Sequence, residues 1–238
     1  MRRSTTVFAL CAILAAALFI RLGFWQLDRR RQRLTRNATI RERMRLPPVP
    51  LRELNGDTTA THYRQVRVVG HPDFDRDLAL TLRGNQGSPG VDILTPVIIP
   101  GSDSAVLVNR GWIYAPDGMT ADLSRWREPD TSFVGYVEEF DSDAPDSVRL
   151  NGIRRASYGG IAHVLPYPIR PFYIVVTSDS APAKGRVVRL GIPVLTEGPH
   201  LSYAIQWFSF ATIALIGAGF IMVRSMRSPT GEDKGNNP

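Results

Sequence analysis

Few residues of this chain have the types and spacing that catalysis or metal binding requires. No two of its four histidines are spaced as metal ligands usually are, and these histidines are His62, His71, His163 and His200. Asp73, Asp75 and Asp77 alternate, which would place three carboxylates on one face of a strand. Such a row can hold a cation, although a solvated sheet edge is the simpler interpretation.

The usual sequence motifs of enzymes are missing as well. The chain contains no GxSxG, no HExxH and no phosphate-binding glycine loop. Gly84, Gly87 and Gly90 are typical of turn chemistry. No pairing of a nucleophile with a base is visible. We therefore expect a non-catalytic binding or scaffolding protein rather than a membrane-bound enzyme.

One histidine nevertheless begins an interesting pattern. At 100° per residue, one helical face carries an imidazole, two aromatic rings and three alanines, namely His200, Tyr203, Trp207, Ala211, Ala214 and Ala218. A second predicted helix, earlier in the chain, has a face of mostly small residues that suits helix packing, formed by Ala12, Ala16, Phe19, Gly23 and Gln26. Each helix places a glutamine beside a tryptophan, as Trp25-Gln26 and Gln206-Trp207. Opposed glutamines could bond across the pair, for about 1 kcal/mol.

These residues belong to two apolar segments near the ends of the chain. Residues 5–27 and 201–223 each contain 23 positions, which span about 34 Å as helix and can cross a bilayer. A cleaved signal peptide is the alternative for the first segment, and a buried soluble helix for the second. We expect two transmembrane helices and a short polar tail at residues 224–238.

The positive charge is concentrated next to these apolar segments. Residues 46–199 hold 15 Lys and Arg against 18 Asp and Glu, whereas the rest of the chain holds 14 against 4. Eight arginines lie within residues 29–45. This distribution suits anionic lipid headgroups and argues against nucleic-acid binding. The single cysteine, Cys11, excludes an intrachain disulfide and CxxC chemistry.

Between the helices we expect a basic, Pro-rich linker at 28–50 and a β-rich domain at 51–199. Short runs rich in β-branched residues predict a mostly antiparallel barrel or sandwich, at 63–69, 78–82, 91–99, 105–114, 133–139, 172–177 and 187–194. A short helix is predicted near 120–126. The sequence Asn109-Arg-Gly-Trp112 ends one strand, where a bulge covered by Trp112 is favoured over a ligand-binding role. Arg83 and Arg110 are candidates for surface contacts.

Together these features resemble one family, the Surfeit-locus cytochrome c oxidase assembly proteins. Leu22-Gly-Phe-Trp-Gln-Leu-Asp-Arg29 resembles its LGxWQxxR signature, and Tyr63-Arg-Gln-Val66 resembles its YRxV strand. Val108-Asn-Arg-Gly-Trp-Ile113 is similar to its VNRGW strand, and His200-Leu-Ser-Tyr-Ala-Ile-Gln-Trp-Phe208 to its HLxYAxQWF segment. The motifs follow in the family's order across nearly the whole chain. Residues 138–171 depart from the pattern, and Gly198-Pro199 stand where the family often has Asn-Asn.

The resemblance implies a role in building haem-copper oxidase. It implies assistance with haem a insertion into the catalytic subunit, and contact with the machinery that synthesises haem a is a further possibility. His200 matches the histidine proposed as the iron ligand in bacterial members. Physically, a neutral imidazole can ligate haem iron, with Tyr203 and Trp207 flanking the macrocycle and Trp25, Gln26 and Gln206 completing the rim. A histidine that merely anchors the helix end, in an accessory subunit without haem, is the alternative.

Membrane topology receives conflicting indications. The family places its domain outside the cytoplasm with both termini inside, whereas the arginine cluster on the domain side favours the opposite by the positive-inside rule. Because that rule weakens for long translocated segments, we expect an extracytoplasmic domain and cytoplasmic termini. No transit peptide precedes the first helix, so a bacterial plasma (inner) membrane is expected.

Overall fold

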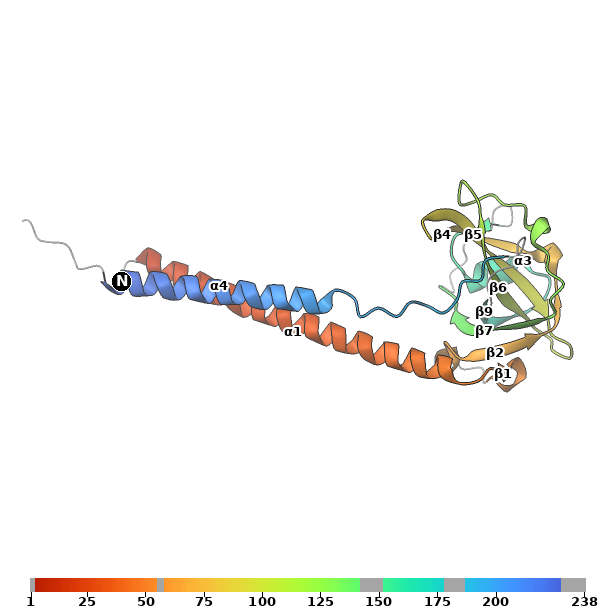
Figure 1. Cartoon of the computed structure of the whole chain (residues 1–238), viewed down its shortest axis with the longest axis horizontal. Coiled ribbons are helices and arrows are strands. Elements are labelled where there is room, and N and C mark those ends of the chain that lie inside the picture. Colours follow the sequence, from red (N-terminus) through yellow and green to blue (C-terminus); the bar gives the residue numbers. More distant parts are fainter. Residues whose placement is uncertain (1–2, 55–57, 142–151, 178–186, 228–238) are drawn as a thin grey trace, which may run out of the picture. The chain divides into compact units, whose positions relative to one another are not determined.

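The computed structural model describes residues 3–54, 58–141, 152–177 and 187–227, and it separates into two compact units. One unit is Met1–Thr39 with Leu195–Pro238, and the other is Ile40–Val194. The first consists mainly of two helices and the second of a β-sheet domain (Figure 1). We describe each unit by itself.

Helix α1 (Arg3–Arg45) and helix α4 (His200–Arg227) are the two helices that are long and apolar enough to cross a membrane. Most of their apolar side chains are exposed, as expected of surfaces that face lipid rather than a protein core. The predicted linker at 28–50 is wrong in part, because α1 continues to Arg45. Residues 28–45 contain good helix formers and neither glycine nor proline, so nothing ends the helix before Pro47.

The two helices lie side by side, with small residues at their contact (Figure 1). On α1 the buried positions include Ala9, Ala16 and Gly23, and on α4 they are Ala204, Ala211 and Ala218. Aromatic rings fill the remaining space, since Phe19 stacks on Trp207 and Phe24 meets Phe208 edge to face. The packing face predicted around Ala16, Phe19, Gly23 and Gln26 is confirmed, whereas Ala214 is only partly buried.

The domain contains one mixed, mostly antiparallel sheet. Its strand order is β1-β2-β7-β9-β6-β5-β4-β8, with β3 paired to β5. The bounds are β1 Val49–Pro50, β2 Gln65–Val69, β3 His71–Pro72, β4 Leu78–Asn85, β5 Ser88–Ile98, β6 Ala105–Tyr114, β7 Ser132–Glu139, β8 Gly152–Ile153 and β9 Ile169–Val176. The pairs β1–β2, β4–β8 and β6–β9 are parallel. The predicted fold class, two apolar helices flanking a β-rich domain, is confirmed.

Buried aliphatic and aromatic side chains hold the sheet together. The larger core cluster contains Val66, Val68, Val106, Val108, Phe172 and Ile174, all at most 1% exposed. The β-branched runs that predicted strands coincide with strands, with the exception of 187–194, where Val187 is nevertheless buried. In that run only Val188 pairs with a strand, through an isolated antiparallel β-bridge to Trp112, because Gly191 and Pro193 interrupt the run.

Short helices connect the strands. They are η1 Leu51–Glu53, α2 Thr58–Thr61, η2 Phe74–Arg76, η3 Leu123–Trp126 and α3 Tyr158–Val164. The helix predicted near 120–126 is present only as the 3-10 turn η3. The longer α3 was missed, because its Gly159-Gly160 pair disfavours helix, although Ser157 caps it by accepting a hydrogen bond from the Gly160 amide.

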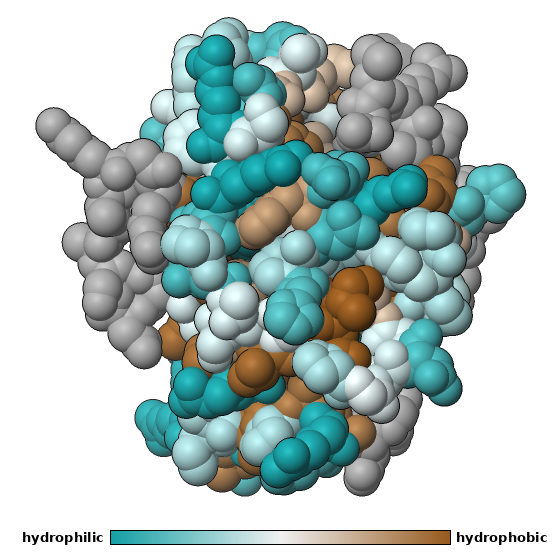
Figure 2. All heavy atoms as spheres, turned by 90° about the vertical axis from the view of Figure 1, so that its right-hand side faces the viewer, coloured by the Kyte–Doolittle hydropathy of each residue, from teal (hydrophilic) through white to brown (hydrophobic). Residues whose placement is uncertain are grey.

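Figure 2 shows one face of the molecule, on which hydrophilic side chains predominate and the hydrophobic ones form small separate patches. Patches of that kind are normal on a protein surface and do not by themselves indicate a docking site.

Candidate functional site

His200 is the first residue of α4, and Thr196, Glu197 and Gly198 before it lie against α1. Thr196 attaches this segment to α1, because its carbonyl oxygen accepts hydrogen bonds from Arg33 Nε at 2.9 Å and from Asn37 Nδ2 at 3.1 Å. Glu197 adds a 2.8 Å ion pair with Arg30. The position of His200 is therefore set by polar side chains of α1 as well as by the helix that it begins.

The imidazole of His200 is oriented by Gln26. His200 Nδ1 and Gln26 Oε1 are 2.9 Å apart. With Gln26 Oε1 as the acceptor, Nδ1 is the donor, and in a neutral imidazole Nε2 then carries the lone pair. A hydrogen bond from one ring nitrogen to a fixed acceptor is the usual way in which a protein prepares the other nitrogen as a metal ligand.

Gly198 keeps space open beside that nitrogen. Its φ is +72°, a left-handed conformation that glycine adopts most readily. A Cβ built on Gly198 would lie 3.4 Å from His200 Nε2, 3.3 Å from His200 Cδ2 and 3.6 Å from Arg33 Nη1. The imidazole and the guanidinium thus border the same small space, which any other side chain at position 198 would fill.

The structure places the other predicted rim residues as follows. Trp207 stacks on Phe19, with ring centroids 5.7 Å apart. Trp25 and Tyr203 are 52% and 45% exposed, and the Gln206 side chain is also exposed. The expected Gln26–Gln206 bond is wrong, since Gln26 binds His200 instead. Of the six rim residues, the structure brings His200 and Gln26 together.

Sequence reasoning missed Arg33, Thr196 and Gly198. Arg33 was one of eight similar arginines, and no motif distinguished it from its neighbours. Gly198 did give a signal, because Gly198-Pro199 departs from the Asn-Asn expected from the resemblance.

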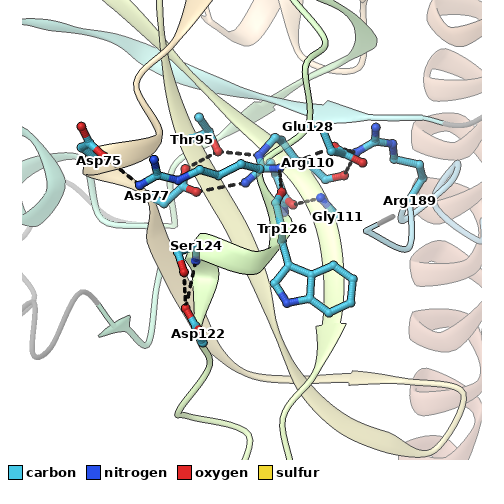
Figure 3. A network of polar contacts seen from close by, with 12 residues as sticks. Asp75, Asp77, Thr95, Arg110, Gly111, Asp122, Ser124, Trp126, Glu128 and Arg189 are labelled. Carbon is cyan, nitrogen blue, oxygen red and sulfur yellow. Dashed lines mark hydrogen bonds and ion pairs between the residues drawn. The ribbon is translucent and has the colours of Figure 1, made fainter. Parts of the chain in front are cut away.

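The domain has a second conspicuous group, centred on Arg110 (Figure 3). Arg110 is fully buried, so the expectation of a surface contact is wrong. Its Nε donates to Thr95 Oγ1 at 2.6 Å, and its Nη2 donates to Asp77 Oδ2 at 3.0 Å. Glu128 Oε2 lies 3.5 Å from Arg110 Nη1 and 3.0 Å from Arg189 Nη1. This group holds η2, β4, β5, β6 and the segment after η3 together.

A bulge brings Arg110 to this position. The β5–β6 register shifts between Ile93 and Leu94, so that Gly111 and Asn109 face them and Arg110 is the extra residue. The guanidinium then lies over the Phe74 ring, with its Cζ 5.1 Å from the ring centroid. The predicted bulge is confirmed, and Trp112, 8% exposed, packs over Gly90.

The three alternating aspartates do not form a cation site. Asp77 pairs with Arg110, Asp75 with Arg127, and Asp73 accepts a hydrogen bond from the Tyr167 hydroxyl. Within the part of the chain that the structure describes, no group of three or more His, Cys, Asp or Glu side chains is suited to a metal ion. Burial raises the pKa of the Asp77 carboxyl to about 6, although the Arg110 charge acts in the opposite direction.

The fold and the His200 site define a class of protein: a β-sheet domain between two helices able to cross a membrane, with an oriented imidazole where the second helix begins. Residues 13–212 match the model of the SURF1 family, so the chain belongs to the SURF1 family, which is linked to cytochrome oxidase assembly.

Relatives from distant organisms agree with this assignment. An uncharacterised SURF1-like protein of Mycobacterium tuberculosis is 28% identical over 236 residues, covering 92% of this chain and 83% of the relative. A SURF1-like protein of Rickettsia bellii is 24% identical over 221 residues, covering 87% of each chain. Surfeit locus protein 1 of chicken is 26% identical over 149 residues, covering 56% of this chain and 45% of the relative.

Proposed function

We propose that this protein is a non-catalytic assembly factor for haem-copper oxidase, and that it holds haem a for insertion into the catalytic subunit. The observation that carries the proposal is the hydrogen bond between Gln26 Oε1 and His200 Nδ1, which leaves Nε2 as the lone-pair nitrogen. Neutral imidazole is the common protein ligand of haem iron.

The residues present fit such a group. The donor set is one imidazole whose Nδ1 is hydrogen-bonded to Gln26, and no side chain at position 198 fills the space beside Nε2. Apolar and aromatic side chains of α1 and α4 are exposed near this end of the pair, among them Trp25 and Tyr203. When bound, haem a would supply the redox-active iron and a large apolar surface. The chain itself would supply a nitrogen ligand through His200 and the orientation of that nitrogen through Gln26.

A non-catalytic role suits the domain. Three of its buried charged groups form ion pairs with one another and connect strands, namely Arg110, Asp77 and Glu128. Its partners in this proposal are the catalytic subunit of the oxidase, the machinery that synthesises haem a, and anionic lipids facing the arginines of α1.

An absorption spectrum tests the haem proposal. The full chain, purified in mild detergent from cells that make haem a, is expected to show a Soret band and an α band, and the His200→Ala variant is expected to lose both. His71→Ala is the matched control, because His71 lies in β3 of the sheet domain. A wild-type protein without haem that co-purifies stoichiometrically with the oxidase would overturn the proposal in favour of an accessory subunit.

We further propose that the domain lies outside the cytoplasm of a bacterium, in its plasma (inner) membrane, and that both termini lie inside. Replacing Cys11 by serine gives a cysteine-free background. Asp103→Cys, in the exposed β5–β6 connection, should then react with an impermeant maleimide in intact cells, whereas Met226→Cys should react only after permeabilisation. The reverse pattern would place the domain in the cytoplasm.

A further inference from the structure

Arg33 is hydrogen-bonded to the segment that precedes His200. Its Nε donates to the Thr196 carbonyl at 2.9 Å and its Nη2 donates to Thr196 Oγ1 at 3.4 Å. These two bonds orient the guanidinium, which is exposed to solvent. They leave Nη1 next to Gly198, within 3.6 Å of the position that a Cβ would occupy there.

The charge of Arg33 is not neutralised by an acidic side chain. Its neighbour Arg30 pairs with Glu197 at 2.8 Å, and Asp28 accepts a hydrogen bond from Gln32 at 2.8 Å. Among the described residues, no carboxylate lies within ion-pair distance of Arg33. An oriented guanidinium with an unused N–H and no carboxylate partner is suited to bind an external carboxylate or phosphate.

The two groups that border the Gly198 space have complementary chemistry. His200 Nε2 presents a lone pair and Arg33 Nη1 presents a hydrogen-bond donor with positive charge. A ligand that uses both must carry a Lewis-acidic centre and an anionic group in one rigid molecule. A haem has this combination, with iron at the centre of the ring and two propionates on one edge.

The distribution of apolar and polar residues along α1 suits a haem whose propionates face Arg33. The apolar run ends at Leu27, and Arg33 lies six residues beyond it, about 9 Å further along the helix axis. A propionate edge that faces Arg33 would lie on the polar side. The apolar substituents of the ring would then face the hydrophobic surfaces of α1 and α4.

We infer that Arg33 binds a propionate of the haem whose iron His200 ligates, and that it thereby sets the orientation of the macrocycle. This inference rests on the proposed function. Gly198 contributes by leaving the space between the two groups unfilled.

Comparing haem a with its dimethyl ester tests the inference, because the ester lacks the propionate charges. Both are titrated into the detergent-purified full chain and followed by absorption. We expect Arg33→Gln to weaken binding of the free acid about tenfold and to leave binding of the ester unchanged. Arg33→Lys keeps the charge and should restore part of the preference for the free acid. Arg31→Gln is the matched control, because Arg31 is exposed on the same helix.

The outcomes separate the two proposals. Equal binding of the free acid by wild type and Arg33→Gln would overturn the inference while leaving the role of His200 intact. An equal loss for acid and ester would also overturn it, because it would show that Arg33 acts only by holding Thr196. Failure of the wild-type protein to bind either compound would defeat the proposed function itself.

Discussion

The ring of Phe208 occupies the place where a side chain at position 23 would begin. A Cβ on Gly23 would lie 2.7 Å from both Cε1 and Cζ of that ring. The contact joins α1 to α4 about one turn from Gln26 along α1 and about two turns from His200 along α4. The glycine therefore determines how closely the two helices approach near the candidate site.

Gly23→Leu is expected to push the helices apart. It should lower the free energy of unfolding of the detergent-solubilised chain by about 2 kcal/mol, within the usual range for overpacking, and so lower its melting temperature. Gly217→Leu is the matched control, since nothing lies within 4 Å of a Cβ there. Adding Phe208→Ala to Gly23→Leu should recover part of the loss. Equal melting temperatures for the two leucine variants would contradict the assigned contact.

Gln26 is expected to determine which nitrogen of His200 carries the proton. Nitrogen-15 NMR of the full chain labelled in histidine should show the Nδ1–H form of His200 in the wild type and a mixture of tautomers in Gln26→Leu. Haem affinity should fall about tenfold in the same variant, as for other lost hydrogen-bond partners of metal ligands. Gln206→Leu, on the exposed side of α4, should change neither measurement. A wild-type spectrum dominated by the Nε2–H form would refute the assignment.

Among the charged residues of the domain, Arg110 should be the one whose replacement lowers the free energy of unfolding most. Replacing it with methionine leaves Asp77 and Glu128, 4% and 5% exposed, without their shared cation. We expect a loss of about 3–5 kcal/mol in the free energy of unfolding, because an unpaired buried charge remains. Arg125→Met removes an ion pair to Asp122 that is largely solvated, so it should leave the free energy of unfolding nearly unchanged. Denaturant unfolding of the full chain in detergent, followed by tryptophan fluorescence, measures both.

The stability of the domain should depend on the protonation of Asp77. Its pKa is about 6 in the folded protein, above the ordinary value of 3.8. The folded state therefore binds this proton more tightly than the unfolded state does, so the contribution of Asp77 is most favourable below about pH 4 and is lost as the pH rises through 6.

Unfolding midpoints of wild type and Asp77→Asn between pH 4 and 7 provide the test. The difference between the two curves isolates Asp77 from the other carboxyl groups. We expect the wild type to lose stability relative to Asp77→Asn as the pH rises over this interval. A parallel pair of curves would show that the Arg110 charge cancels the effect of burial.

The elements that follow local patterns could be predicted from the sequence. The 23-residue apolar runs gave both long helices, and the run at 105–114 coincides with strand β6 (Ala105–Tyr114). The bulge at Arg110 followed from a glycine and a tryptophan at a strand end. These features depend on neighbouring residues alone, so one sequence is sufficient.

The failures at the two polar sites share one physical cause, which is pairing between residues far apart in the chain. Arg110 looked like a surface residue because its charge partners Asp77 and Glu128 lie 33 and 18 positions away. Gln26 was expected to meet Gln206, but His200, 174 positions from Gln26, lies closer. The selection of Arg33 among eight arginines depends on the path of residues 195–199 along α1, which composition does not show.

The small buried residues of the two helices recur every seven positions, at 9, 16 and 23 on α1 and at 204, 211 and 218 on α4. Seven residues in two turns correspond to 3.5 per turn, slightly fewer than the 3.6 of a straight helix. A seam of that period stays in contact only if both helices wind around each other with a left-handed twist. The pair is thus a short antiparallel coiled coil with alanine and glycine in place of the usual leucines.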